Sequence, residues 1–113
     1  MKFKFDYNPV ADSLYVVDEK KEVKSSLRYG NAVIDFDSED KIAGIELLNV
    51  SKNYNYSKSL FKAIKKAKIT KKVIQNVLFV LVILVLKEVA IRVPENKCIS
   101  EISLSTQLPY SAV

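Results

Sequence analysis

Acidic side chains are the groups of this sequence that could work together in catalysis. Asp35 and Asp37 are two residues apart in an apolar segment, so on a strand both would project from one face. Other acids that a folded sheet could bring near them are Asp6, Asp12, Asp40 and Glu46. Two or three converging carboxylates can hold Mg²⁺ for the hydrolysis of a substrate. Alternation with apolar residues also fits the water-facing side of a sheet, and we expect this second arrangement.

Composition excludes most other kinds of active site. The chain has no histidine, which excludes histidine-based triads, imidazole bases and imidazole metal ligands. Its two glycines, Gly30 and Gly44, cannot form a phosphate-binding loop or a dinucleotide fingerprint. A single cysteine, Cys98, builds neither a zinc nor an iron–sulfur site, and we give it no role. We therefore expect a protein that is not an enzyme, with no catalytic residue, no metal ligand and no cofactor.

Positive charge is concentrated in the second half of the chain. Residues 1–52 carry 8 basic and 10 acidic side chains, whereas residues 53–113 carry 10 basic and 3 acidic ones. A lysine cluster of this kind could neutralise the phosphates of DNA or RNA, lie on an anionic membrane or simply face solvent. With 16 lysines and 2 arginines, the sequence argues against specific recognition of bases and against the bidentate binding of phosphates. The lysines that a nucleic acid would contact are Lys58, Lys62, Lys65, Lys66, Lys71 and Lys72.

Length and composition indicate one globular domain that spans residues 1–113. Hydrophobic residues make up 49% of the chain and charged residues 27%, as in an ordinary soluble protein with a core. The charged start, Met1-Lys-Phe-Lys, lacks the features of a signal peptide, and one cysteine permits no internal disulfide. We therefore expect a cytoplasmic location. The abundance of lysine and isoleucine is typical of an AT-rich genome, such as that of a thermophilic archaeon or its virus.

Residues 1–52 have the alternation of an antiparallel β-meander. Gly44 indicates a bulge or a close approach of two backbones within its strand. Asp12 follows the break at Asn8-Pro9, so we expect its carboxylate to accept hydrogen bonds from backbone amides and to shape the turn. The four expected strands lie at residues 3–7, 14–17, 32–37 and 42–48.

A basic amphipathic helix is expected at residues 57–68. Ser57 or Ser59 can cap its first turn. The apolar side chains that fall on one side at helical spacing are Leu60, Phe61, Ile64 and Ala67. Lysines occupy the opposite side, so the apolar side would dock on the preceding sheet.

The segment Val77–Leu86 contains ten apolar residues without interruption. A membrane-spanning helix needs about twenty, so we expect no membrane span. A strand or a buried helix remains, and the many valines favour the strand. Residues 69–74 and Val89–Pro94 could pair with it, and residues 99–104 could add one more short strand. The sequence therefore predicts an α+β fold of a four-stranded meander, one basic helix and further antiparallel strands at residues 69–113.

A strand that is apolar on both faces must pack against another element on each face, since exposed apolar surface costs about 25 cal/mol per Å². The helix could cover one face. A second copy of the chain, in a two-fold dimer, could cover the other. Alternatively, Val89–Pro94 and the tail fold over that face within one chain. The interface residues of the expected homo-oligomer are Val77, Phe79, Val80, Val82, Leu84 and Leu86.

Several residues of the first half have the spacing of a known family. They are Tyr7, Pro9, Ala11, Asp12, Leu14 and Tyr15, then Val33 to Asp37, and then Gly44, Ile45, Glu46 and Leu48. With these residues, positions 3–50 resemble the small prokaryotic family called domain of unknown function 2283, with Lys41 where that family usually has a glycine. The resemblance implies a compact β-rich domain with a binding role, in some members beside small toxin-like proteins, and it carries over no catalytic residue.

The function expected from these features is that of a small, non-catalytic protein-interaction module, which would be antitoxin-like if the resemblance extends to its role. The alternative function is non-specific binding of nucleic acid through the basic helix.

Overall fold

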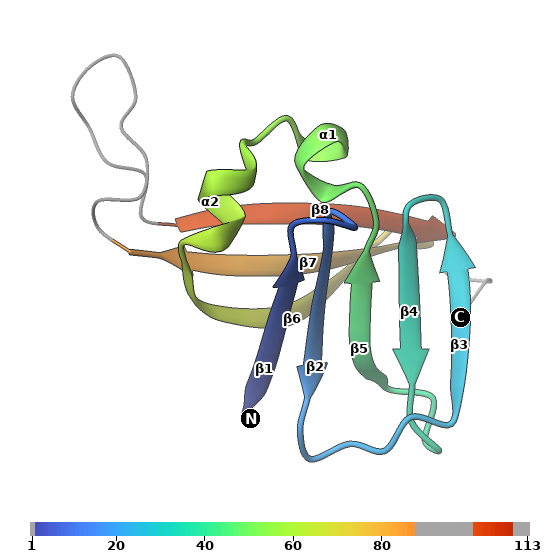
Figure 1. Cartoon of the computed structure of the whole chain (residues 1–113). Coiled ribbons are helices and arrows are strands. Elements are labelled where there is room, and N and C mark those ends of the chain that lie inside the picture. The colour runs from blue at the N-terminus through green and yellow to red at the C-terminus, as the bar shows by residue number, and fades with distance from the viewer. Residues whose placement is uncertain (1, 88–100, 110–113) are drawn as a thin grey trace.

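The computed structural model describes residues 2–87 and 101–109, and within these ranges the chain forms two β-sheets and two short helices. Figure 1 shows the strands β1–β5 side by side in one layer, with β6–β8 running across them in a second layer and both helices at one end. The elements are β1 Phe3–Asn8, β2 Ser13–Asp18, β3 Ser25–Tyr29, β4 Ala32–Phe36, β5 Ile42–Leu47, α1 Val50–Tyr54, α2 Lys58–Lys62, β6 Ile64–Ile74, β7 Val77–Leu86 and β8 Glu101–Pro109.

The first sheet contains all four strands predicted in residues 1–52, but it is not a simple meander. Its order is β1-β2-β5-β4-β3, and all pairs are antiparallel. The prediction missed β3, because only Leu27 of this strand is half-buried and its other four residues are exposed. β3 pairs with β4 at the sheet edge, across a turn at Gly30 with a φ of 61°. β5 lies in the middle of the sheet, between β2 and β4.

The second sheet has β7 at its centre, between β6 and β8. The strand predicted at Val77–Leu86 is confirmed with these bounds, and so is its pairing with residues 69–74. The hairpin turns through Gln75 and Asn76, which both have positive φ, as two-residue hairpins of the primed type require. β8 pairs with the other edge of β7 and extends the short strand expected near residues 99–104. Val89–Pro94 and Cys98 lie outside the described residues.

The prediction of a basic helix at residues 57–68 is wrong beyond Lys62. α2 ends at this residue and β6 begins at Ile64. The start agrees with the prediction, because the Leu60 amide donates a hydrogen bond to the Ser57 hydroxyl at 3.3 Å. A short lysine-rich helix is marginal by itself, whereas pairing with β7 provides a backbone ladder from Ile64 to Ile74. Most of the clustered lysines therefore lie on a strand.

The two sheets share one hydrophobic core. The first sheet contributes side chains such as Leu14, Val16, Ile34 and Ile45, which are inaccessible to solvent. The core side chains of the second sheet are Leu78, Val80, Val82, Leu84 and Leu86 of β7 with Ile102, Leu104 and Leu108 of β8. Leu60 and Phe61 of α2 close one end, and the Phe61 ring stacks on Tyr7 with 5.3 Å between ring centroids. A buried side chain of the Val or Leu type contributes about 1.5–3 kcal/mol, so the inner row of β7 is a large part of the stability.

This core corrects the residues expected at an oligomer interface. Val80, Val82, Leu84 and Leu86 are buried within the chain and cannot contact a second copy. The helix was expected to cover this face of β7, but the first sheet covers most of it. Only Val77 and Phe79 of the six predicted interface residues lie on the opposite, outer face, since successive side chains of a strand alternate.

Asp12 fixes helix α1 to the first hairpin. The N-cap residue of α1, Asn49, makes no side-chain capping bond. Asp12, which precedes Ser51 by 39 residues in the sequence, caps the helix instead. Its carboxylate accepts hydrogen bonds from the Ser51 amide at 3.2 Å and from the Ser51 hydroxyl at 2.7 Å. The Tyr7 hydroxyl donates to the same carboxylate at 2.7 Å. The prediction that Asp12 accepts from a backbone amide is confirmed, but the amide is that of Ser51, and the side chain that accepts from the amides of the turn is Asn8.

We predict that Asp12→Asn lowers the free energy of unfolding by about 1–3 kcal/mol at neutral pH, because three donors lose a charged acceptor. Burial opposes ionisation of Asp12, but the hydrogen bonds from Ser51 and Tyr7 outweigh it and lower its pKa below the ordinary 3.8. The contribution of this carboxylate is therefore present at neutral pH and is lost as the pH falls through the lowered value. Urea unfolding should show the difference between wild type and variant shrinking in acid.

The matched control is Asp6→Asn, since Asp6 is exposed on β1. This substitution should change stability by less than about 0.5 kcal/mol. Equal stabilities of Asp12→Asn and wild type at neutral pH would contradict the capping role.

Candidate polyanion-binding groove

The acids considered as an alternative metal site accept hydrogen bonds within the fold, and the expectation that they face water is wrong for Asp35. The Asp35 carboxylate is buried and accepts hydrogen bonds from the Tyr15 hydroxyl at 2.9 Å and the Ser26 hydroxyl at 2.6 Å. Asp37 instead accepts from the backbone amides of Lys41 and Glu39, both at 2.9 Å, and these bonds lower its pKa. Within residues 2–87 and 101–109, no three histidine, cysteine or acidic side chains are grouped as metal ligands would be. The acids at these positions shape the sheet and its turn.

Gly44 provides the space through which Tyr15 reaches Asp35. A Cβ atom at Gly44 would lie 3.3 Å from the Tyr15 hydroxyl, 3.3 Å from Asp35 Oδ2 and 3.1 Å from the Val16 carbonyl oxygen. The register of β4 and β5 also shifts beside this point. The bulge and the close approach predicted from Gly44 are both confirmed. Burial, followed by the hydrogen bond to Asp35, raises the pKa of Tyr15 to about 12, so its hydroxyl stays a donor at neutral pH.

We predict that Tyr15→Phe lowers the free energy of unfolding by about 1–3 kcal/mol, because the buried Asp35 carboxylate loses one of its two hydroxyl donors. Denaturant unfolding measures this loss. Tyr29→Phe removes a hydroxyl from a side chain that is 41% exposed and should leave stability within about 0.5 kcal/mol of wild type. Similar losses in both variants would show that Tyr15 has no special role.

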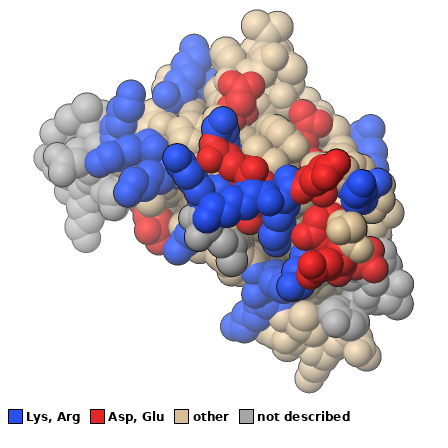
Figure 2. Space-filling view, turned by 90° about the horizontal axis from the view of Figure 1, so that it is seen from below, with Lys and Arg blue, Asp and Glu red and all other residues tan. Residues whose placement is uncertain are grey.

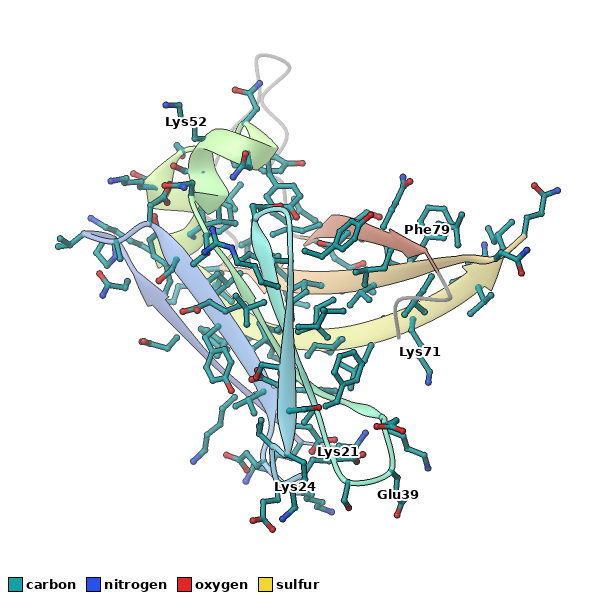
Figure 3. The ribbon with its side chains drawn as sticks, turned by 90° about the vertical axis from the view of Figure 1, so that its right-hand side faces the viewer. Lys21, Lys24, Glu39, Lys52, Lys71 and Phe79 are labelled. Atoms are coloured by element: carbon teal, nitrogen blue, oxygen red, sulfur yellow. The ribbon has the colours of Figure 1, made fainter. Side chains whose placement is uncertain are left out.

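A first cleft, the end cleft, opens at the end of the sandwich opposite the helices. It has a volume of about 620 Å³. Lysines reach it from three different segments: Lys21 from the loop after β2, Lys41 from the turn before β5 and Lys71 from β6. Figure 3 shows Lys71 pointing down from β6, on the side where Lys21 lies and away from Lys52 on α1. The apolar part of the lining is Phe3, Ile42 and Ile69.

A second cleft, the side cleft, runs along β6 beside β1 and has a volume of about 820 Å³. Its basic residues are Lys2, Lys65, Lys66 and Lys68, and its apolar residues are Phe3, Phe5, Ala67, Ile69, Ile83 and Val85. Phe3, Ile69 and Thr70 line both clefts. The two clefts are therefore continuous, and we call them together the lysine groove.

The lysine groove is strongly positive. Its lining includes seven lysines, against the two acids Asp18 and Glu101. Two of the lysines have partners in the first sheet: Lys41 lies 3.4 Å from the Glu39 carboxylate, and Lys21 donates to the Ile42 carbonyl oxygen at 3.1 Å. Seen from below, lysine and arginine side chains form a band from the left side of the molecule to its centre; acidic side chains lie beside this band and are most numerous toward the right (Figure 2).

The structure divides the six lysines that the sequence assigned to nucleic-acid binding. Lys65, Lys66 and Lys71 line the lysine groove. Lys58 and Lys62 are on α2, where Lys58 donates to the Pro9 carbonyl oxygen at 3.0 Å. Lys72 is exposed on β6 and lines neither cleft.

Sequence reasoning missed the groove residues that lie outside the lysine cluster. They include Lys2, Lys21, Lys41, Phe3 and Phe5, and Lys68 of β6 was also not among the six assigned lysines. The alternation of lysine and phenylalanine at residues 2–5 was a signal for the strand, but nothing in it placed this strand beside β6.

None of the helices in the described ranges is long and apolar enough to cross a membrane. No solved structure matches the chain.

Relatives of the chain occur in archaea. An uncharacterised protein of Methanocaldococcus jannaschii is 39% identical over 79 residues, which cover 66% of this chain and 68% of that protein. A protein of Methanosarcina mazei with the provisional name hypoxanthine phosphoribosyltransferase is 31% identical over 62 residues, or 55% of this chain, and the chain spans only 50% of its length. Residues 4–51 match the family described as protein of unknown function (DUF2283). The chain belongs to this family, as its motif residues predicted.

Proposed function

We propose that the protein is a non-catalytic binding module that holds single-stranded nucleic acid in the lysine groove, without preference for sequence. The observation that carries this proposal is the gathering of seven lysines from β6, the start of β1 and two loops of the first sheet along one continuous depression. A row of cations in a groove attracts a chain of phosphates, because each neutralised phosphate releases counterions.

The apolar lining of the groove favours a single strand over a duplex. Phe3 and Phe5 are half-buried and line the side cleft from β1, and Ile83 and Val85 line it from the outer face of β7. Bases of a single strand can contact such side chains, whereas a duplex keeps its bases stacked inside. The lysine-rich lining supports contact with phosphates rather than the bidentate reading of bases that arginine provides.

The motif residues support the non-catalytic part of this proposal. Asp12, Asp35 and Asp37 each accept hydrogen bonds that hold an element of the fold in place. A protein-interaction module, which the sequence analysis expected, would also be non-catalytic. The positive charge of the lysine groove favours a polyanion as the ligand instead. The membrane alternative is weaker, because it required an amphipathic helix over residues 57–68, and α2 has only five residues.

The substitutions Lys65→Ala, Lys68→Ala and Lys71→Ala combined should weaken binding of a labelled oligo-dT by at least about tenfold at about 50 mM salt. Each lysine that contacts a phosphate of a single strand contributes about 0.7 to the slope of log affinity against log salt. The triple variant should therefore lower the slope by about 2, as measured by fluorescence anisotropy between about 50 and 200 mM salt.

The matched control combines Lys52→Ala, Lys62→Ala and Lys72→Ala, which removes the same charge from exposed positions outside the groove. It should retain nearly the affinity and slope of wild type. Equal effects of the two triple variants would mean that only net charge attracts the oligonucleotide. Absence of binding by wild type at about 50 mM salt, or tighter binding of a duplex, would overturn the proposal.

A further inference from the structure

The outer face of the second sheet carries a central apolar stripe. Its side chains are the alternate residues of β7 that point away from the core, namely Val77, Phe79, Leu81, Ile83 and Val85. They are partly exposed, while Leu78, Val80, Val82, Leu84 and Leu86 are buried. Figure 3 shows the β6–β7 hairpin, which carries Phe79, projecting away from the first sheet. In the hairpin, Ile74 continues the stripe and is 44% exposed.

Polar residues of opposite character border this stripe on its two sides. Paired residues of neighbouring antiparallel strands share a face, so the register of the second sheet defines rows across it. One row is Lys66, Val85 and Glu101, and the next is Lys68, Ile83 and Ser103. Farther along the sheet, Lys72, Phe79 and Gln107 form another row. The β6 side of the face is therefore basic, and the β8 side is neutral to acidic.

We propose that a second copy of this chain covers this face, related by a two-fold axis that runs parallel to β7. Rotation about such an axis stacks the two stripes and places β6 of each copy over β8 of the other. Each row of one copy then faces the same row of the other copy, with its residues in the opposite order. Lys66 therefore lies over Glu101 of the partner subunit, at two equivalent places. A two-fold axis perpendicular to β7 would instead stack β6 on β6 and oppose lysine to lysine. Charge complementarity selects the first axis.

Face-to-face packing suits this surface for a second reason. Two sheets with apolar inner faces pack about 10 Å apart with nearly aligned strands, as a central apolar stripe between polar rows allows. The long stems of Lys66, Lys68 and Lys72 can cover the rim while their charged ends stay in water. Without such a partner, the apolar stripe would stay in contact with water and would favour non-specific aggregation.

This inference does not depend on the proposed function, but the two surfaces overlap. Lys66, Lys68, Ile83, Val85 and Glu101 also line the side cleft. A partner copy and an oligonucleotide would therefore compete for this part of the molecule, and self-association is measured in the absence of nucleic acid.

Sedimentation equilibrium of the full chain, at micromolar concentration and about 50 mM salt, tests the proposal with a charge exchange. Wild type should associate to twice its 12.8 kDa. Lys66→Glu and Glu101→Lys should each raise the dissociation constant about tenfold, because symmetry turns two attractive pairs into two repulsive ones. The double variant with both reversals should recover most of the wild-type affinity.

Lys62→Glu, which makes the same charge change on α2, is the control and should leave association unchanged. Leu81→Lys should give a monomer. If that variant does not fold, the exchange of the exposed residues Lys66 and Glu101 still decides the question. A wild-type monomer at every concentration, a double variant no tighter than either single one, or a Lys66→Glu variant that associates more tightly would each overturn the proposal.

Discussion

Burial of one face of β7 is the constraint on which the rest of this structure depends. The inner residues of this strand, from Leu78 to Leu86, lie against the first sheet with almost no exposed surface. Without them, the five-stranded sheet would leave Leu14, Ile34 and Ile45 open to water. β6 and β8 are ordered by pairing with β7, and the short helices fill the open end of the core. Removal of this contact would separate two layers that each lack a core of their own.

The hydrogen-bonded carboxylates of the first sheet show how the fold itself can require the acidic residues of a motif. Asp12 joins a turn to a helix, Asp35 joins three strands through Tyr15 and Ser26, and Asp37 closes a hairpin. A buried carboxylate that loses its donors is costly, so such residues are tied to their partners by stability alone. These three carboxylates are therefore engaged in structural contacts of the first sheet and its turns.

Both proposed binding surfaces arise from the position of β6 as an edge strand. Lysines of β6 line the groove from both sides of the strand, and Lys66 and Lys68 on its outer side also border the apolar stripe of β7. The matched family segment, residues 4–51, ends before β6. The first sheet is thus the part shared with the family, whereas the surfaces proposed for binding lie largely in the second sheet. Because Lys66 belongs to both surfaces, occupation of one would affect the other.

Local patterns in the sequence determined the strands with strong alternation, the apolar strand at Val77–Leu86 and the hairpin that precedes it. These features follow from side-chain periodicity and turn chemistry, which act over a few residues. The sequence did not determine β3, whose exposed residues carry no periodic signal, or the order of the first sheet, which depends on β5 pairing with both neighbours. The end of α2 at Lys62 and the joining of Lys21, Lys41 and Lys71 in one cleft were decided by tertiary structure alone. The physical reason is the same in each case, because pairing with a distant strand outweighs a weak local preference and sets which distant side chains meet.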